Sequence, residues 1–322
     1  MRLKSRLLLG LLFVNFLAPW AGAQEKYPVK PINFSVPLPP GATVDIIARL
    51  YGDKLSQRVG QPVTVSNRTG AGGVIASDFV VKASPDGYAL LFGNSQHSIN
   101  AALLPKMPYD PMRDFVGVAM VAEAPSLVVV NPDLGVRTLR DFIALAKKQP
   151  GSINYGAGAA GTSTHLAGAD FAHFAGIQLT HVPYGGGNII PDLLSNRIQA
   201  MFVPVAFLLS QVKEGKLIAL AISSPEPLRN PIAVPSAHEA GLPGYAYSAW
   251  YGMLASAKTP PPVLARLGSE MQQISDDAEV REKLQIQGII PRKMALQEFD
   301  AFIRADVARI SALIKASGIK AQ

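Results

Sequence analysis

Cysteine is absent from the 322-residue chain, and charged residues are scarce. The lack of cysteine excludes disulfide frameworks, zinc–cysteine sites, iron–sulfur clusters, thiol catalysis and lipid attachment at an N-terminal cysteine. Charged residues make up 16% of the chain and hydrophobic residues 48%, which excludes a largely disordered chain and allows a sizeable core. A chain of 322 residues is long for one compact domain and predicts two.

Residues 1–23 have the pattern of a signal peptide. Three basic residues precede a short apolar stretch, Leu7–Ala18, and Ala21-Gly22-Ala23 fits a cleavage site after Ala23. We therefore expect an exported protein; the apolar stretch is too short to span a bilayer as an uncleaved anchor. Cleavage removes three basic residues and no acidic residue, which lowers the net charge from +7 to +4. No dense basic run remains, so nucleic acid is not an expected partner, whereas small anions are favoured.

Short apolar runs alternate with segments of helical periodicity along the rest of the chain. The alternation predicts an α/β fold with mainly parallel sheets. Strands are expected over residues 32–36, 63–65, 88–92, 127–130, 153–155, 180–183, 199–203, 217–222 and 247–255. Helices are expected over residues 44–59, 74–82, 139–148 and 164–174, and the last 60 residues are expected to be helical, with starts near Pro261, Asp276 and Leu296.

The lobe-1 loop, residues 37–45, joins the first strand to the first helix. Such a junction places free backbone N–H groups at the carboxyl edge of a sheet, where the helix dipole is positive and favours an anion. Its prolines have no N–H, so the candidate donors are Leu38, Gly41, Ala42, Thr43 and Val44. An ordinary strand–helix turn is the alternative. Asp45 either stabilises the helix N-terminus or pairs with an ammonium group of a ligand.

The lobe-2 loop, residues 156–165, follows a strand and precedes a helix. Three of its residues match the G-x-G-x-x-G pattern of dinucleotide sites: Gly156, Gly158 and Gly161. Such a site needs an acidic residue at the end of the next strand, where His181 stands, so no nucleotide cofactor is expected. An anion site is still supported, because hydroxyls lie beside a helix start: Thr162, Ser163 and Thr164. Simple N-capping by one of these hydroxyls is the alternative.

Catalysis and metal binding have weak support. The G-x-S-x-G turn of serine hydrolases would need glycine where His165 stands, and His165 is poorly placed to act as a base for Ser163. A periplasmic serine hydrolase is the less favoured alternative. The histidines form neither HxxxH nor HExxH, so no metal site is expected: His97, His165, His173, His181 and His238.

Several strings, all in one order, resemble the solute-binding proteins of tripartite tricarboxylate transporters, the Bug family. They are YPVKPI at 27–32, PPGATVDIIAR at 39–49, GQPV at 60–63, NRTGAGG at 67–73, PDGY at 85–88, YDP at 109–111, HLAG at 165–168, HVPY at 181–184, GKL at 215–217 and EAGLPGY at 239–245. The resemblance implies a two-lobed type II periplasmic binding protein with a ligand cleft between the lobes. It places residues 24–123 and 250–322 in lobe 1 and residues 124–249 in lobe 2.

The resemblance further implies a receptor rather than an enzyme, without a cofactor. It would capture a dicarboxylate, tricarboxylate, aromatic carboxylate or acidic amino acid by hinge closure, and deliver it as a monomer to the integral-membrane permease subunits of a tripartite transporter. A sensor that presents its ligand to a two-component kinase is the alternative.

By position, the resemblance assigns thirteen residues to the ligand site. The lobe-1 loop supplies Leu38, Pro39, Gly41, Ala42, Thr43 and Asp45; the lobe-2 loop supplies Gly161, Thr162, Ser163 and Thr164; and the sides are lined by Asn94, Ser95 and Tyr184. The sequence departs from the family pattern at Ala42, Thr69 and Ala169, where glycine, proline and an acid are usual. Segment 185–191 lacks the usual lysine and Pro-Ala pair. These departures leave the ligand's identity open.

Overall fold

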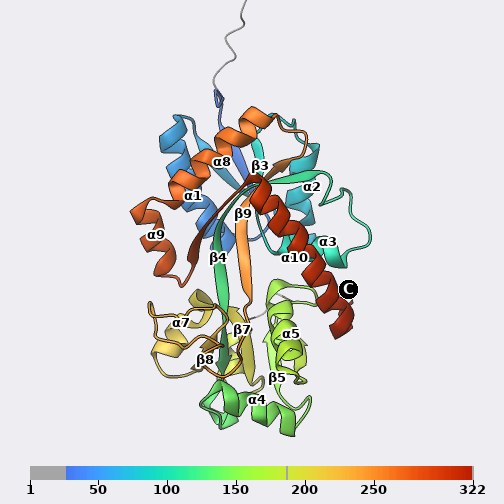
Figure 1. The fold of residues 1–322 in the computed structure, drawn as a ribbon, viewed down its shortest axis with the longest axis vertical. Coiled ribbons are helices and arrows are strands. Elements are labelled where there is room, and N and C mark those ends of the chain that lie inside the picture. Colours follow the sequence, from blue (N-terminus) through green and yellow to red (C-terminus); the bar gives the residue numbers. More distant parts are fainter. Residues whose placement is uncertain (1–26, 186–187, 321–322) are drawn as a thin grey trace, which may run out of the picture.

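The computed structural model describes residues 27–185 and 188–320, so the expected signal peptide lies outside the described residues. Two α/β lobes are joined by two long central strands, β4 (Phe115–Val130) and β9 (Ser248–Ser256) (Figure 1). This arrangement confirms the predicted two-lobed α/β fold. None of the helices in the described ranges is long and apolar enough to cross a membrane.

Lobe 1, the upper lobe of Figure 1, is built from the N-terminal and C-terminal parts of the described chain. Its elements are β1 (Ile32–Val36), α1 (Thr43–Val59), β2 (Val63–Asn67), α2 (Val74–Lys82), β3 (Ala89–Asn94), α3 (Gln96–Leu103), α8 (Pro261–Ser275), α9 (Ala278–Gln285), β10 (Ile290–Ala295) and α10 (Leu296–Ser317). Its hydrophobic core lies between the sheet and α1 and α8, and includes the fully buried Phe34, Tyr51 and Phe92.

Lobe 2, the lower lobe, is built from the middle of the chain. Its elements are α4 (Leu139–Lys148), β5 (Asn154–Ala157), α5 (Ser163–Ala175), β6 (Thr180–Pro183), α6 (Ile190–Leu194), β7 (Ala200–Pro204), α7 (Val205–Lys213) and β8 (Ile218–Ile222). The predicted cap of α4 is confirmed, since the Thr138 hydroxyl accepts a hydrogen bond from the Asp141 amide at 3.1 Å. A second core packs Phe142 and Phe171 against Tyr155 and Phe202.

The strands follow one path, β2-β1-β3-β9-β4-β7-β5-β6, and β10 and β8 also pair with β4. β1 pairs in parallel with β2 and β3, and β5 pairs in parallel with β6 and β7. β4 pairs with β9 from Phe115 to Pro125 and with β7 from Ser126 to Val130, so one continuous strand belongs to the sheets of both lobes. The predicted lobe boundaries, 123/124 and 249/250, fall inside β4 and β9; the division at those residues stays a prediction.

Two expectations for the chain were wrong. The last 60 residues are not all helical, because β10 pairs antiparallel with β4; its IPRKMA sequence lacks the apolar run of an interior strand. The strand expected at 127–130 begins at Phe115, because pairing with β9 continues through Gly117, Glu123 and Pro125, residues that discourage a strand prediction.

Helix α10 leaves lobe 1 and reaches α5 of lobe 2 (Figure 1). Ile310 and Leu313 of α10 and Ile99 of α3 form a buried apolar cluster with Leu166 of α5. Arg309 pairs with Asp170 of α5 at 3.0 Å. The lobes are therefore linked by α10 as well as by the two long strands.

Candidate functional site

The two predicted ligand loops lie at one edge of the lobe interface. Since β1 and β3 are parallel neighbours, the lobe-1 loop and Asn94-Ser95 leave the sheet at the same carboxyl edge. Gln96, the next residue, donates from Nε2 to the Gly161 carbonyl of the lobe-2 loop at 3.2 Å. The structure thus brings segments from both lobes together where the sequence placed the ligand.

Asp45 is the organising residue of the lobe-1 loop. It is 2% exposed, and its carboxylate accepts hydrogen bonds from the Gly41 amide at 2.9 Å, Asn67 Nδ2 at 2.8 Å and Arg49 Nε at 3.1 Å. Burial acts to raise the pKa of Asp45, but these hydrogen bonds outweigh it and hold the pKa below its usual value. The contacts fit the helix-stabilising interpretation of Asp45; direct contact with a ligand stays a prediction.

Three of the five candidate donors of the lobe-1 loop are free. The Gly41 amide is bound to Asp45, and the Ala42 amide donates to the Pro39 carbonyl at 3.2 Å. Within residues 27–185 and 188–320, the other three amides find no protein acceptor: Leu38, Thr43 and Val44. Thr43 and Val44 are the first two residues of α1, where the helix dipole is positive.

The lobe-2 loop has the same design at the start of α5. The Gly158 amide donates to the Thr164 hydroxyl at 3.1 Å, and the Thr162 hydroxyl donates to the Ala159 carbonyl at 2.8 Å. Thr162 occupies the N-cap position but makes no side-chain cap. Over the part of the chain that the structure describes, the amides of Ser163 and Thr164 have no protein acceptor. They give α5 a pair of free donors equivalent to the pair on α1.

Gly161 is required where the lobe-2 loop approaches lobe 1. Its φ angle is +81°, in the left-handed region that favours glycine. A Cβ atom at this position would lie 2.3 Å from Cδ2 of Leu103, which belongs to α3 of lobe 1. The glycine therefore permits both the turn and the close contact between the lobes.

The three residues expected to line the sides are each fixed by a hydrogen bond within the protein. Asn94 is buried and accepts from the Gln96 amide at 3.2 Å, while the Ser95 hydroxyl accepts from the Trp250 amide of β9 at 2.8 Å. Tyr184 donates to Asp192 at 2.7 Å, and burial together with this bond raises the pKa of Tyr184 to about 12. Ser95 thus couples the edge to the central strand β9. Contact of these three residues with a ligand stays a prediction.

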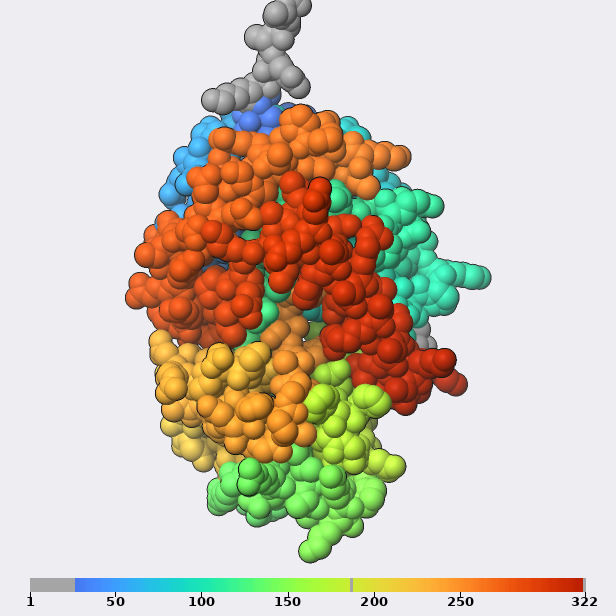
Figure 2. Space-filling model, in the orientation of Figure 1, coloured from blue at the N-terminus to red at the C-terminus, as the bar shows by residue number. Residues whose placement is uncertain are grey.

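A cavity of about 320 Å³, here called the waist cavity, lies between α10, the central strands β4 and β9, and lobe 2. Figure 2 shows this face hollowed between the C-terminal helix and the lower lobe. None of the thirteen predicted site residues lines the cavity. The space beside Asn94 at the predicted site has a volume of only about 10 Å³.

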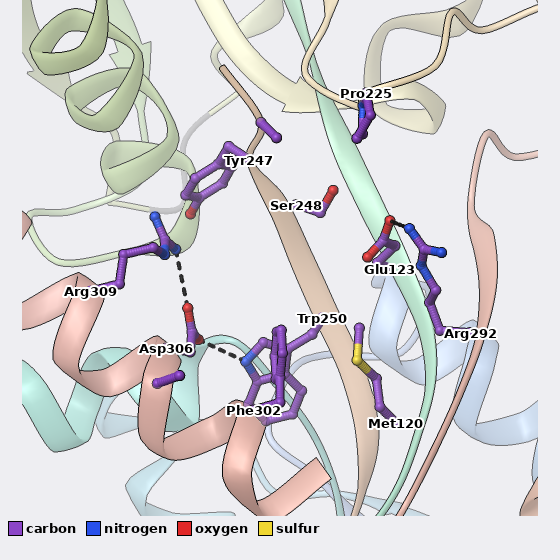
Figure 3. Close-up of a pocket in the computed structure, with 12 residues that line it drawn as sticks. Met120, Glu123, Pro225, Tyr247, Ser248, Trp250, Arg292, Phe302, Asp306 and Arg309 are labelled. Atoms are coloured by element: carbon purple, nitrogen blue, oxygen red, sulfur yellow. Dashed lines mark hydrogen bonds and ion pairs between the residues drawn. The ribbon is translucent and has the colours of Figure 1, made fainter. Parts of the chain in front are cut away.

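Two ion pairs face each other across the waist cavity (Figure 3). Glu123 pairs with Arg292 at 2.6 Å, and Asp306 pairs with Arg309 at 3.1 Å. Asp306 also accepts from the indole N–H of Trp250 at 3.0 Å. Sequence reasoning missed this network; the available signal was the i, i+3 spacing of Asp306 and Arg309 on an amphipathic helix.

Sequence reasoning also missed two roles at the predicted site. Gln96, which connects the lobes, had no signal beyond its place after a strand end. His165 and His181 both bind the lobe-2 loop backbone, through Gly161 and Gly158. Their signal was their position in two of the quoted strings, HLAG and HVPY.

Comparisons with known proteins cover most of the chain. The model of the family described as tripartite tricarboxylate transporter family receptor matches residues 47–319. Protein BugT of Bordetella pertussis is 33% identical over 299 residues, which cover 92% of each chain. A Rhodopseudomonas palustris protein solved with adipate superposes with a TM-score of 0.81, at 29% identity over 92% of this chain and 99% of that one. MatC from the same organism, solved with bound malate, has a TM-score of 0.76 at 28% identity, over 89% of this chain and 100% of that one.

Proposed function

Because this chain belongs to the family of tripartite tricarboxylate transporter receptors, which are periplasmic solute-binding proteins, we propose that it captures a small carboxylate between its lobes. Closure about the hinge strands would then present the loaded receptor to the permease subunits of such a transporter. The relatives solved with adipate and malate support a carboxylate as ligand, because each is similar to this chain over about nine-tenths of its length.

The observation that carries the proposal is the matched pair of helix starts. Thr43 and Val44 on α1, and Ser163 and Thr164 on α5, have amides without a protein acceptor, and Gln96 ties the two edges together through Gly161. A carboxylate oxygen is the acceptor that such donors bind best, at roughly 1.5–3 kcal/mol for each charge-assisted bond. A few such bonds, less the cost of ordering, give micromolar affinity, about −8 kcal/mol.

The charge at the edge is compatible with an anion. Asp45 alone would repel a ligand carboxylate. However, Arg49 pairs with Asp45 at 2.9 Å, and the Gly41 amide donates a hydrogen bond to Asp45. The negative charge is thereby neutralised locally, and the positive end of α1 faces the interface. No buried arginine is needed to hold the ligand.

The same geometry argues against hydrolysis at Ser163. A serine nucleophile needs a base aimed at its hydroxyl, and His165 uses Nδ1 to accept the Gly161 amide at 3.0 Å. The His165 ring is also stacked on His181. We therefore propose binding without a bond-breaking step.

A ligand panel tests the proposal. Thermal shift and calorimetry with adipate, malate, citrate, benzoate and glutamate would be compared with glucose and putrescine, since at a given concentration a tighter ligand raises Tm more. We expect at least one carboxylate to bind and the two controls to fail. Binding of glucose or putrescine with no response to any carboxylate would refute the proposal.

The site is tested by removing one backbone donor. Ser163→Pro deletes the amide at the first position of α5, where proline is tolerated and where the preceding Thr162 is already extended at φ −80°, ψ 159°. We expect an affinity loss of about tenfold, equivalent to roughly 1.4 kcal/mol. Ser163→Ala is the matched control, because it removes the hydroxyl and keeps the amide. Equal affinity of the proline variant and the alanine control would exclude this donor from the site.

A further inference from the structure

His165 and His181 form a stacked pair beneath the lobe-2 loop. His165 comes from the first turn of α5 and His181 from β6, and their ring centroids lie 3.8 Å apart with an angle of 15° between the planes. Tyr155 of β5 packs against both rings, with centroid distances of 5.3 Å to His181 and 6.3 Å to His165. The pair is thus enclosed by three elements of lobe 2.

Each imidazole is hydrogen-bonded to the backbone of the lobe-2 loop. The Gly161 amide donates to His165 Nδ1 at 3.0 Å, and His181 Nε2 lies 3.0 Å from the Gly158 carbonyl. An amide only donates and a carbonyl only accepts, so His165 Nδ1 carries no proton and His181 Nε2 carries one. The first bond exists only while His165 is neutral.

We propose that His165 and His181 are positioning residues that hold the lobe-2 loop in its ligand-binding shape, and that the hold through His165 lasts only while its ring is neutral, so that acidification loosens the loop and releases the captured anion. The inference rests on the proposed function for its consequence, the release of a ligand. The loosening itself concerns the ligand-free chain. It assigns the two histidines a role that neither the packing of a core nor a direct ligand contact would give them.

Three physical effects oppose a charge on this pair. Burial, together with the neighbouring His181, lowers the pKa of His165 to about 4; burial also lowers the pKa of His181, against the bond to Gly158. The positive end of α5 disfavours an imidazolium in its first turn. Two charged rings 3.8 Å apart would repel each other strongly.

The other ionisable groups around the pair do not compensate. Burial raises the pKa of Tyr155 well above its usual value, so its hydroxyl, which donates to the His165 carbonyl at 3.3 Å, stays neutral. Asp170, the acidic residue of α5, pairs with Arg309 of α10 at 3.0 Å. Tyr247, the residue before β9, donates to the Ser163 carbonyl at 3.1 Å.

The direction of the pH effect follows from linkage. A released loop lets His165 titrate at its ordinary pKa of 6.5, whereas the held loop keeps its pKa at about 4. The released form therefore binds more protons between these values, and release becomes easier as pH falls from 6.5 toward 4. With these two pKa values, the ratio of released to held loop rises about 30-fold between pH 7.5 and pH 5.

The test is amide hydrogen exchange of the ligand-free protein, resolved at Gly161. After correction for the intrinsic exchange rate, we expect the protection of this amide to fall up to about 30-fold between pH 7.5 and pH 5. His165→Asn offers a carbonyl oxygen near the position of Nδ1 but does not titrate. In this variant we expect the Gly161 amide to keep its protection at pH 7.5 and to lose much less of it at pH 5 than in the wild type. His165→Leu offers no acceptor and should be poorly protected at both values.

Adipate and malate serve as probes of release, with affinity measured in the wild type and in His165→Asn. The carboxylates' own protonation affects both proteins equally, so a steeper loss of affinity at low pH in the wild type reports the histidine pair. Unchanged Gly161 protection in the wild type, or an equal fall in His165→Asn, would overturn the inference. Failure of every carboxylate to bind, with the exchange result as expected, would instead refute the proposed function.

Discussion

The lobe-1 loop and the lobe-2 loop present similar backbone donors, but side chains of different chemistry hold them in place. Asp45 holds the lobe-1 loop through a charged carboxylate with Arg49 and Asn67 as partners. His165 and His181 hold the lobe-2 loop through imidazole nitrogens, and the bond to His165 requires a neutral ring. A carboxylate with a lowered pKa stays charged in mild acid, whereas a neutral imidazole must resist protonation there. The comparison teaches that matched ligand donors need not respond alike to pH.

Removal of the Asp45 carboxylate, which holds the lobe-1 loop, should have the largest effect, a loss of stability. Asp45→Ala leaves the Gly41 amide and Asn67 without their buried acceptor and Arg49 without its partner. We expect the free energy of unfolding to fall by about 3 kcal/mol, measured by urea denaturation. Asp45→Asn, which keeps the shape and one acceptor oxygen, should lose about half as much. Equal stability of Asp45→Ala and the wild type would show that this loop does not depend on its carboxylate.

The pH response should differ between the loops. Because the pKa of Asp45 is lowered below its ordinary 3.8, its contribution is complete above pH 3.8 and is lost only as pH falls through the lower value. The Gly41 amide should therefore keep its exchange protection from pH 7.5 to pH 5, while Gly161 loses up to about 30-fold. A parallel loss at both glycines would point to general unfolding and remove the distinction between the loops.

Deletion of one backbone donor in lobe 1 should weaken ligand binding about as much as the Ser163→Pro deletion in lobe 2. Thr43→Pro removes the amide at the first position of α1, and the preceding Ala42 is already extended at φ −67°, ψ 153°. We expect an affinity for adipate or malate about tenfold weaker than that of the Thr43→Ala control, by calorimetry. An effect confined to one of the two proline variants would mean that one lobe supplies most of the binding energy.

The smallest effect is expected at the additional link between the lobes. Asp170→Asn removes the ion pair with Arg309, in which the arginine side chain is 44% exposed. We expect the free energy of unfolding to fall by less than 1 kcal/mol, because half-exposed ion pairs contribute little. Thermal denaturation in low and high salt measures it, and the gap between variant and wild type should narrow in salt. A loss above 2 kcal/mol would make this link structurally decisive.

The sequence predicted those features that depend on local pattern. The helix over 74–82 and the strands over 32–36 and 180–183 were predicted with the observed bounds, because their apolar spacing and flanking turns agree. β10 and the first half of β4 were not predicted, since their strand character comes from pairing with distant segments. Tertiary pairing can override local preference in this way.

At the candidate site too, the features set by local pattern could be predicted and those set by tertiary contacts could not. The two loops could be placed from strand–helix junctions, because the carboxyl edge of a parallel sheet is set by topology. Which amides stay free could not be predicted, because Gly41 and Gly161 lose theirs to Asp45 and His165 only in the folded chain. The contact of Gln96 with Gly161 likewise depends on how the lobes meet.

The pairing within the hinge has a consequence for how such receptors can be re-engineered. At the predicted lobe boundaries the chain enters and leaves lobe 2 at facing positions, since Ala124 is registered opposite Ala249 and Pro125 opposite Ser248. Partners in an antiparallel pair have Cα atoms only about 5 Å apart. Lobe 2 is thus topologically a cassette with adjacent ends. A chimaera that exchanges this cassette between relatives would keep both crossing points and could transplant half of a recognition surface in a single piece.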